Sequence, residues 1–485
     1  MIHLFGIFEN LLHLEDDRIR DLAMYQCLQP DIMQIVVNSL SGEPSVASAA
    51  LDMIEWWMKR RKYLENLSPL VANLSLELNQ LLLYGKDGAL VKKSIRIVGF
   101  TAQEGTFLCR LPKGSFAVTD PSSHGKHWGD QFTLNIWRLY FEPIYQEDVI
   151  RATKALLAIA SDNIRGHLYQ QNIVEALKEL VESNLDVVVI FGLMARDEPA
   201  RIELIEKEIA HKMINLIDNN KLAEDRLSIR NAIIELCSPV VQTTLPESSR
   251  VHGFVRHVMK VVTQKLHDCT ATQDCYGIVK RVLSNIKIPI VGVFDLSSNM
   301  DDLKALLRSM KSSAERLGFV SEGEHGAHEA RSSAANLNSS TQFEVFMGDT
   351  DSRQCKNGDS ANILANRVEF IEATLAFTTR EKFVQVLLEE SFHDVMIRIA
   401  GEKQSSDKAE LTASEERVYI SQISKGLDHF FERVTFFADG CTVLYEHGTL
   451  IQSIRSIAGT TASKFSKQAK DLLSKIENGR SASSV

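Results

Sequence analysis

The chain has 485 residues, of which 44% are hydrophobic and 24% are charged, so it can bury a continuous core as folded proteins of average composition do. Its formal net charge of −9 argues against a general nucleic-acid-binding protein, because such proteins neutralise phosphates with clustered lysine and arginine. The seven cysteines are odd in number and scattered, which predicts reduced thiols in a cytoplasmic or nuclear protein. The apolar start of the chain is short, lacks a basic head and meets an acidic run at residues 15–17, so neither a secretory signal nor a membrane span is expected.

Paired helices are predicted for the N-terminal region, residues 1–104. Pro30 and Pro44 each open an amphipathic run, at a position where the missing amide hydrogen of proline does no harm. Pro44 and Asp87 both stand at the start of such a run and lie 43 residues apart, a spacing within the range of HEAT and armadillo units. Prolines, glycines and serines then crowd together over residues 105–130, which predicts an irregular loop insertion.

One helical pattern occurs twice in the central region, residues 131–318. The copies begin at Ala155 and Ile190, and each contains a helix, a polar break, a short helix with one apolar anchor (Leu168, then Ile202) and a longer amphipathic helix. Asn163 and Glu198 lie 35 residues apart, and Leu180 and Leu216 lie 36 apart. Self-similarity at such a spacing predicts stacked helical repeats, in which each unit buries its apolar face against its neighbour.

This pattern resembles armadillo repeats, with residues 194–217 as the best match. The resemblance continues more loosely through residues 225–237, 250–266 and 276–286. It implies an all-α fold, a right-handed α-solenoid of armadillo-like or HEAT-like repeats.

The sequence departs from the armadillo pattern in two ways. The glycine that usually precedes the third helix is replaced by Gln171-Asn172 and by Lys207-Glu208, which implies helix junctions closer to HEAT geometry. Armadillo import adaptors also carry an array of tryptophan and asparagine on successive third helices. Here those helices contain no tryptophan and only Asn215, so binding of nuclear-localisation peptides is not implied.

A flexible linker is predicted over residues 319–360, which contain few large apolar side chains and many small polar ones. Before it, the apolar run at residues 288–296 fits a strand or a buried helix, and the helical surroundings favour a helix. Residues 361–485 are again predicted to be helical. Thr378 and Glu381 form a capping-box pattern before a helix that should stop near Gly401.

The last helix is predicted over residues 449–478, with one apolar side and a surplus of lysine. The residues that would contact a membrane or a partner are Lys464, Phe465, Lys467, Lys470 and Lys475. Such a helix either caps the array with its lysines in solvent, or lies on an anionic membrane or in the groove of a partner.

No pattern assigns a catalytic, cofactor-binding or metal-binding role, because the glycine-rich phosphate loops, nucleophile elbows and zinc-protease strings are all absent. Five potential zinc ligands occur in one short stretch: His252, His257, His267, Cys269 and Cys275. They lack the closely spaced pairs that a tetrahedral zinc site uses, so ordinary structural roles are favoured. His124 and His127 in the predicted loop lack a nearby carboxylate that could orient either ring. An enzyme is therefore not expected.

The favoured function is a non-enzymatic scaffold that binds other proteins along its helical surface, since stacked helices form an extended surface without any cofactor. The expected contact surface is the exposed face of the third helices in the central region, made up of Lys178, Glu179, Lys212, Asn215 and Arg256. The alternative is a peripheral membrane or trafficking component anchored by the last helix. The sequence does not determine the partner or the oligomeric state.

Overall fold

The computed structural model describes the following ranges of the chain, together with a few isolated positions: residues 30–58, 71–103, 128–159, 162–217, 222–238, 245–284, 300–316, 360–379, 381–401, 413–436, 448–459 and 466–483. Every regular element in these ranges is an α-helix or a short 3-10 helix, which confirms the all-α prediction. No helix in the described ranges is long and apolar enough to cross a membrane. The described chain divides into two compact units, which we call unit 1 (Met1–Leu216 with Asn231–Leu236) and unit 2 (Ile217–Arg230 with Cys237–Val485).

Several sequence-based expectations lie outside the described residues. They concern most of the loop insertion with its two histidines, the apolar run at residues 288–296, the linker as far as residue 359, and the pair Lys464 and Phe465. The structure resumes after the predicted loop at helix α8 (Trp128–Arg138) and after the predicted linker at helix α19 (Ser360–Phe377).

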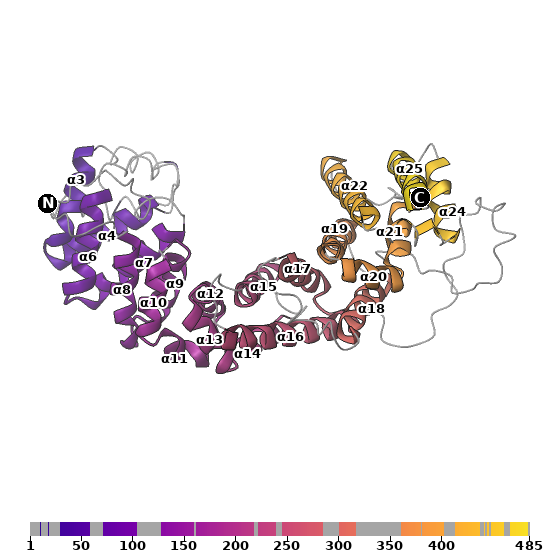
Figure 1. Cartoon of the computed structure of the whole chain (residues 1–485). Coiled ribbons are helices and arrows are strands. Elements are labelled where there is room, and N and C mark those ends of the chain that lie inside the picture. Colours follow the sequence, from indigo (N-terminus) through magenta and orange to yellow (C-terminus); the bar gives the residue numbers. More distant parts are fainter. Residues whose placement is uncertain are drawn as a thin grey trace, which may run out of the picture. The chain divides into compact units, whose positions relative to one another are not determined.

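Unit 1 contains two rows of helices, in each of which successive members are in contact (Figure 1). Row one comprises α4 (Pro44–Met58), α7 (Gly88–Gln103), α9 (Gln146–Leu157) and α12 (Leu185–Met194). Row two comprises α3 (Pro30–Asn38), α6 (Val71–Tyr84), α8, α10 (Asp162–Gln170) and α13 (Glu198–Glu206). Pro30 and Pro44 begin their helices as predicted, and the carboxylate of Asp87 accepts a hydrogen bond from the amide of Ala89 at 2.8 Å, capping α7.

Glycines allow the helices of row one to approach closely. A Cβ atom on Gly99 of α7 would lie 2.9 Å from the Cα of Ala152 on α9. A Cβ atom on Gly192 of α12 would lie 2.6 Å from the Cα of Ala232, on the part of α15 (Ala223–Cys237) that belongs to unit 1. Both distances are shorter than real Cβ contacts, so glycine is required for this packing.

Ion pairs bridge each helix-to-helix step along row one and onto α15. The pairs, in chain order, are Lys93 with Asp52 (2.7 Å), Arg96 with Asp148 (2.8 Å), Lys154 with Asp186 (2.6 Å) and Arg196 with Glu235 (2.7 Å). Each exposed pair contributes at most about 1 kcal/mol.

The doubled pattern of the central region forms two copies of one helical unit. The first copy is α9, α10 and α11 (Ile173–Leu177), and the second is α12, α13 and α14 (Ile209–Asn215). The prediction that the third helix is the longer one is wrong, because α11 has 5 residues and α14 has 7. After Leu177 the chain tightens into a 3-10 turn, η5 (Lys178–Leu180), instead of continuing the α-helix.

Left-handed residues connect the second and third helices at the positions where armadillo repeats usually carry glycine. Asn172 has φ 59° and Glu208 has φ 58°. In the second copy, the amide of Lys207 donates to the carbonyl of Glu203, and the amide of Glu208 donates to that of Ile205. Asn172 and Glu208 therefore form the left-handed turn without glycine. Each carries a Cβ atom, which is unfavourable in this conformation.

Glu208→Gly is accordingly expected to raise the free energy of unfolding by about 0.5–1 kcal/mol, because it removes the left-handed strain of a residue with a Cβ atom. Urea unfolding of the full chain would measure the change. Glu206→Gly is the matched control, since it removes the same charge inside α13 and should be destabilising. If both variants lose stability, the strain at Glu208 is negligible.

Unit 2 also contains a row of helices in which successive members are in contact. Its helices, in chain order after α15, are α16 (Leu245–His267), α17 (Thr272–Ser284), α18 (Asp301–Arg316), α19, α20 (Glu381–Glu389), α21 (Phe392–Gly401), α22 (Ala413–Phe436), α24 (Gly448–Gly459) and α25 (Ser466–Ser483). Helices α17, α19 and α22 form one row by successive contacts, and α16 packs on α18 (Figure 1).

Unit 2 has a left-handed junction of the same kind between α20 and α21. Ser391 has φ 58°, the amide of Glu390 donates to the carbonyl of Val386, and the amide of Ser391 donates to that of Leu388. These are the bonds seen at Lys207 and Glu208. The predicted single helix ending at Gly401 is therefore two helices, although its end point is correct.

The predicted capping box at Thr378 is also wrong. The hydroxyl of Thr378 donates to the carbonyl of Leu375 at 2.7 Å. It therefore pairs with a backbone carbonyl at the end of α19 and does not cap the start of α20.

The predicted last helix is likewise two helices, α24 and α25. Gly459 ends α24, and the hydroxyl of Ser466 donates to the carbonyl of Ala458 at 2.8 Å across the break. Helix α25 then continues to Ser483, past the stop predicted at Asn478-Gly479.

Candidate partner-binding surfaces

Four of the five predicted contact residues lie on or beside the third helices of unit 1. Lys178 begins the 3-10 turn after α11, and its Nζ atom lies 2.6 Å from the carboxylate of Glu175. Lys212 on α14 lies 3.5 Å from the carboxylate of Glu182. Glu179 and Asn215 are exposed, and neither makes a hydrogen bond or ion pair with another described side chain.

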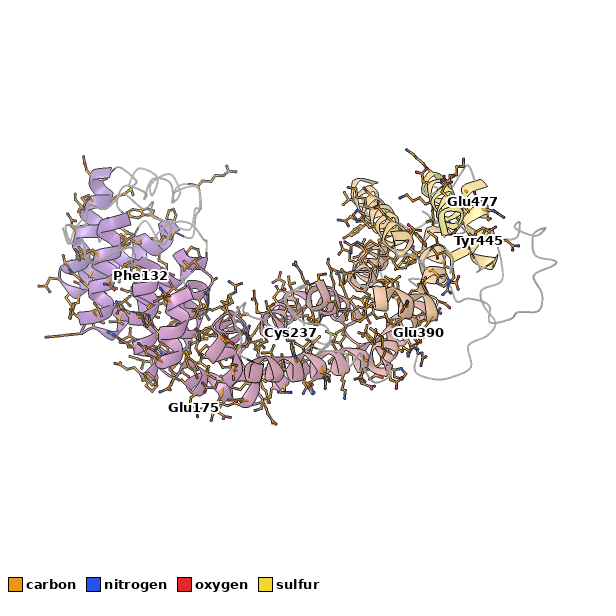
Figure 2. The ribbon with its side chains drawn as sticks, in the orientation of Figure 1. Phe132, Glu175, Cys237, Glu390, Tyr445 and Glu477 are labelled. Atoms are coloured by element: carbon orange, nitrogen blue, oxygen red, sulfur yellow. The ribbon has the colours of Figure 1, made fainter. Side chains whose placement is uncertain are left out.

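An ion-pair network connects these helices to α13. The ammonium group of Lys207 lies 2.7 Å from the carboxylate of Glu175, which is labelled in Figure 2, and 2.5 Å from that of Glu203. Hydrogen bonds from Lys178 and Lys207 lower the pKa of Glu175 from its ordinary value of 4.5 to about 2, and the two glutamates raise the pKa of Lys207. Glu175 therefore stays ionised well below neutral pH.

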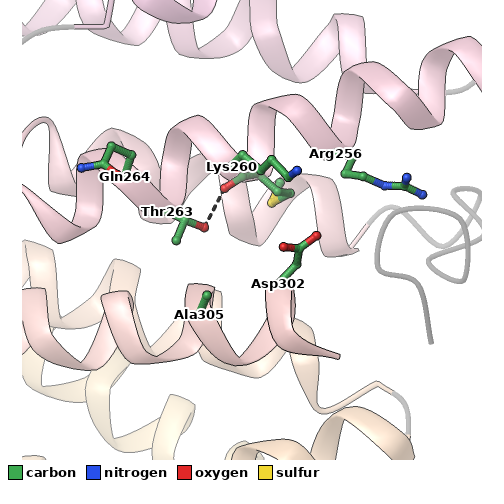
Figure 3. Close-up of a pocket in the computed structure, with 7 residues that line it drawn as sticks. Arg256, Lys260, Thr263, Gln264, Asp302 and Ala305 are labelled. Atoms are coloured by element: carbon green, nitrogen blue, oxygen red, sulfur yellow. Dashed lines mark hydrogen bonds between the residues drawn. The ribbon is translucent and has the colours of Figure 1, made fainter. Parts of the chain in front are cut away.

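Arg256, the fifth predicted contact residue, lies in unit 2 on α16. It lines a groove between α16 and the start of α18 (Figure 3), with a cavity of about 110 Å³. The other lining residues are Met259, Lys260, Thr263, Gln264, Asp302 and Ala305. The five predicted residues therefore divide between the two units, four in unit 1 and Arg256 in unit 2.

Lys260 and Asp302 also line the groove but were not among the predicted contact residues. Lys260 follows Arg256 by one helical turn, so the basic face of α16 could have been recognised from the i, i+4 spacing. Asp302 could not have been recognised in this way, because it lies on α18 and reaches the groove only when α18 packs against α16. Partial burial together with the charge of Arg256 lowers the pKa of His252, one turn before Arg256 on the same helix.

The basic last helix presents its lysines to solvent and its apolar residues to the protein. Lys467 and Lys470 are exposed, and Lys475 lies 3.9 Å from Glu432 of α22. Ala469, Leu472 and Ile476 are buried, and α25 contacts both α24 and α22. Its apolar side is thus already occupied within unit 2.

Among the described residues, no three histidine, cysteine, aspartate or glutamate side chains are placed to hold a metal ion. Cys275 is fully buried, and burial raises the pKa of its thiol to about 12, so it stays protonated at neutral pH. Cys269 occupies a left-handed position with φ 53° in the connection between α16 and α17. Its amide donates to the carbonyl of Leu266, and the next amide, that of Thr270, donates to the carbonyl of Lys265. These two bonds form a Schellman-type end to α16.

No protein-family model matches the sequence, and no curated protein matches it. Solved structures do match in fold. The chain is 11% identical to an engineered protein, with a TM-score of 0.49 and 98% of each chain covered. It is 11% identical to a chain of the SYS-1/POP-1 crystal complex, with a TM-score of 0.49, 97% of this chain and 77% of that chain covered. A chain from work on the interaction between cadherin and β-catenin is 10% identical, with a TM-score of 0.37, 98% of this chain and 99% of that chain covered.

Proposed function

We propose that the chain is a non-enzymatic scaffold of the cytoplasm or nucleus that binds other proteins along its helical-repeat surface. The observation that carries this proposal is the surface of α11, η5 and α14, where ion pairs hold Lys178 and Lys212 and leave Glu179 and Asn215 exposed. A surface whose long side chains are already ordered loses little conformational entropy when a partner binds.

The test is affinity purification of the full-length chain, with copurifying proteins identified by mass spectrometry. The Lys178→Glu, Lys212→Glu variant should lose partners that the wild-type chain retains, because both charges at the surface are reversed. Its melting temperature should change little, since like-charge pairs on a helix surface cost only about 0.2–0.5 kcal/mol each.

The matched control is the Lys467→Glu, Lys470→Glu variant, which changes the net charge equally at two exposed lysines of α25. Equal loss of partners from both variants would show a general charge effect and remove the α11–α14 surface from consideration. Absence of any partner specific to the wild-type chain would contradict the scaffold itself.

A second candidate is a peripheral membrane or trafficking component, and the exposed Lys467 and Lys470 favour it. Because the apolar residues of α25 are buried, binding to anionic lipid would be electrostatic and would weaken steeply with salt. Flotation of the full-length chain with anionic liposomes tests this, and no flotation at low salt would end the idea.

A further inference from the structure

Helix α16 is basic in a chain that is acidic overall. Its described side chains, residues 251–267, include Arg256, Lys260, Lys265 and three histidines but no aspartate or glutamate, whereas the whole chain has a formal net charge of −9. Lys265 serves the fold, because its ammonium group donates to the carbonyl of Ile217 at 2.6 Å. Arg256 and Lys260 remain exposed, about 6 Å apart along the helix axis.

These two cations line one wall of the groove, and α18 supplies the other wall. Figure 3 shows Lys260 and Asp302 on opposite sides of the cavity. Within the described part of the chain, neither of them makes a hydrogen bond or an ion pair. The remaining polar groups are already engaged, since Thr263 donates to the carbonyl of Met259 and Gln264 donates to Asp268. The groove therefore offers an ammonium group and a carboxylate that lack a partner in the described structure.

We infer that this groove binds an acidic segment of a protein partner. A side-chain carboxylate of that segment pairs with Lys260 beside Arg256, and a neighbouring hydrogen-bond donor, such as a carboxamide or a peptide N–H, reaches Asp302. Complementary charges of this kind select the partner and set its register. The inference rests on the proposed protein-binding function and specifies the chemistry of the partner.

A protein segment fits the groove better than a phosphate-rich partner does. A nucleic acid presents phosphates on every residue, and those opposite α18 would meet Asp302 and its neighbour Asp301, both exposed. An anionic membrane surface would meet the same two carboxylates. Only a segment that alternates acceptor and donor groups satisfies both walls.

Fluorescence anisotropy of the full-length chain with short labelled peptides tests the inference. The probe is a glycine-serine peptide that carries alternating glutamate and asparagine, and the comparison peptides replace every glutamate by glutamine or by lysine. We expect saturable binding of the glutamate peptide alone, with a dissociation constant that rises about tenfold in Lys260→Glu. Lys260→Gln should give a smaller rise. Lys425→Glu at an exposed residue of α22, with the same change in net charge, should leave the constant unchanged.

Asp302→Lys provides a test of register. It removes the acceptor for the asparagine donor, so this variant should prefer a peptide in which glutamate replaces the asparagines. Melting temperatures of all variants should match that of the wild-type chain, because the altered side chains are exposed.

Any of four results would overturn the inference: no binding at millimolar peptide, equal binding of the glutamine peptide, equal affinity in Lys260→Glu, or an equal loss in Lys425→Glu. Displacement of the peptide by single-stranded DNA or by anionic vesicles would also overturn it in favour of a phosphate-bearing ligand. If partners still copurify through the α11–α14 surface while the peptides fail, the scaffold function stands and only the assignment of this groove is lost.

Discussion

Gly192→Ala is expected to lower the free energy of unfolding by about 2 kcal/mol, although alanine is the better helix former. The added Cβ atom would lie 2.6 Å from both the Cα and the Cβ of Ala232. These are a backbone atom and the atom attached to it, so no side-chain rotation relieves the clash and the two helices must separate. The loss of close packing along α12 then exceeds the gain of about 1 kcal/mol in helix propensity.

Urea unfolding followed by circular dichroism measures this effect, and Gly253→Ala is its matched control. Gly253 is an exposed residue within α16, and no atom lies within 4 Å of a Cβ atom built there. The same substitution should therefore stabilise the chain by up to about 1 kcal/mol at Gly253 and destabilise it at Gly192. A stabilising effect at both positions would show that α12 and Ala232 do not depend on their close approach.

Tyr276→Leu is expected to destabilise unit 2 by about 3 kcal/mol. The ring of Tyr276 is completely buried and packs edge-to-face on Phe370 of α19, with ring centroids 5.5 Å apart. Its hydroxyl lies 2.7 Å from the hydroxyl of Ser313 and 3.2 Å from the carbonyl of Met310, both on α18. One side chain thus joins α17 to both α18 and α19.

Two milder variants separate the ring from the hydroxyl. Tyr276→Phe keeps the ring and should cost about 1 kcal/mol, the usual net value of one hydrogen bond. Ser313→Ala should cost a similar amount, and the double variant should cost less than the sum because the two groups share one bond. Burial raises the pKa of Tyr276, so its hydroxyl stays protonated and the cost should not vary with pH near neutrality. A loss in Tyr276→Phe as large as that in Tyr276→Leu would mean that the hydroxyl, and not the ring, holds the three helices together.

The helical character of the chain and its repeat in unit 1 were predictable from local sequence. Apolar periodicity depends only on neighbouring residues, and a proline such as Pro30 or Pro44 marks a helix start through its own backbone chemistry. The equivalent junctions at Asn172 and Glu208 were located from the spacing of the repeat. The left-handed conformation of Glu208 was not predictable, because glutamate rarely adopts it, whereas Asn172 belongs to a residue type that adopts it more readily.

The junction at Ser391 was missed for a related reason. Nothing in the local sequence interrupts the apolar pattern of α20 and α21, and serine is compatible with a helix. The hydrogen bonds from Glu390 and Ser391 place it in the same class as Glu208.

The composition of the candidate sites was harder to predict than the helices, because it depends on contacts between residues far apart in the sequence. Local sequence could show that Arg256 and Lys260 share one face of α16, since their spacing is one helical turn. It could not place Asp302 across from them, nor Ala232 against Gly192, because each of these pairs joins residues about 40 positions apart that meet only in the folded protein. Periodicity therefore specifies which faces are buried, whereas the distances between those faces, and so the close glycine contacts and the charged groove, arise from the packing of whole helices.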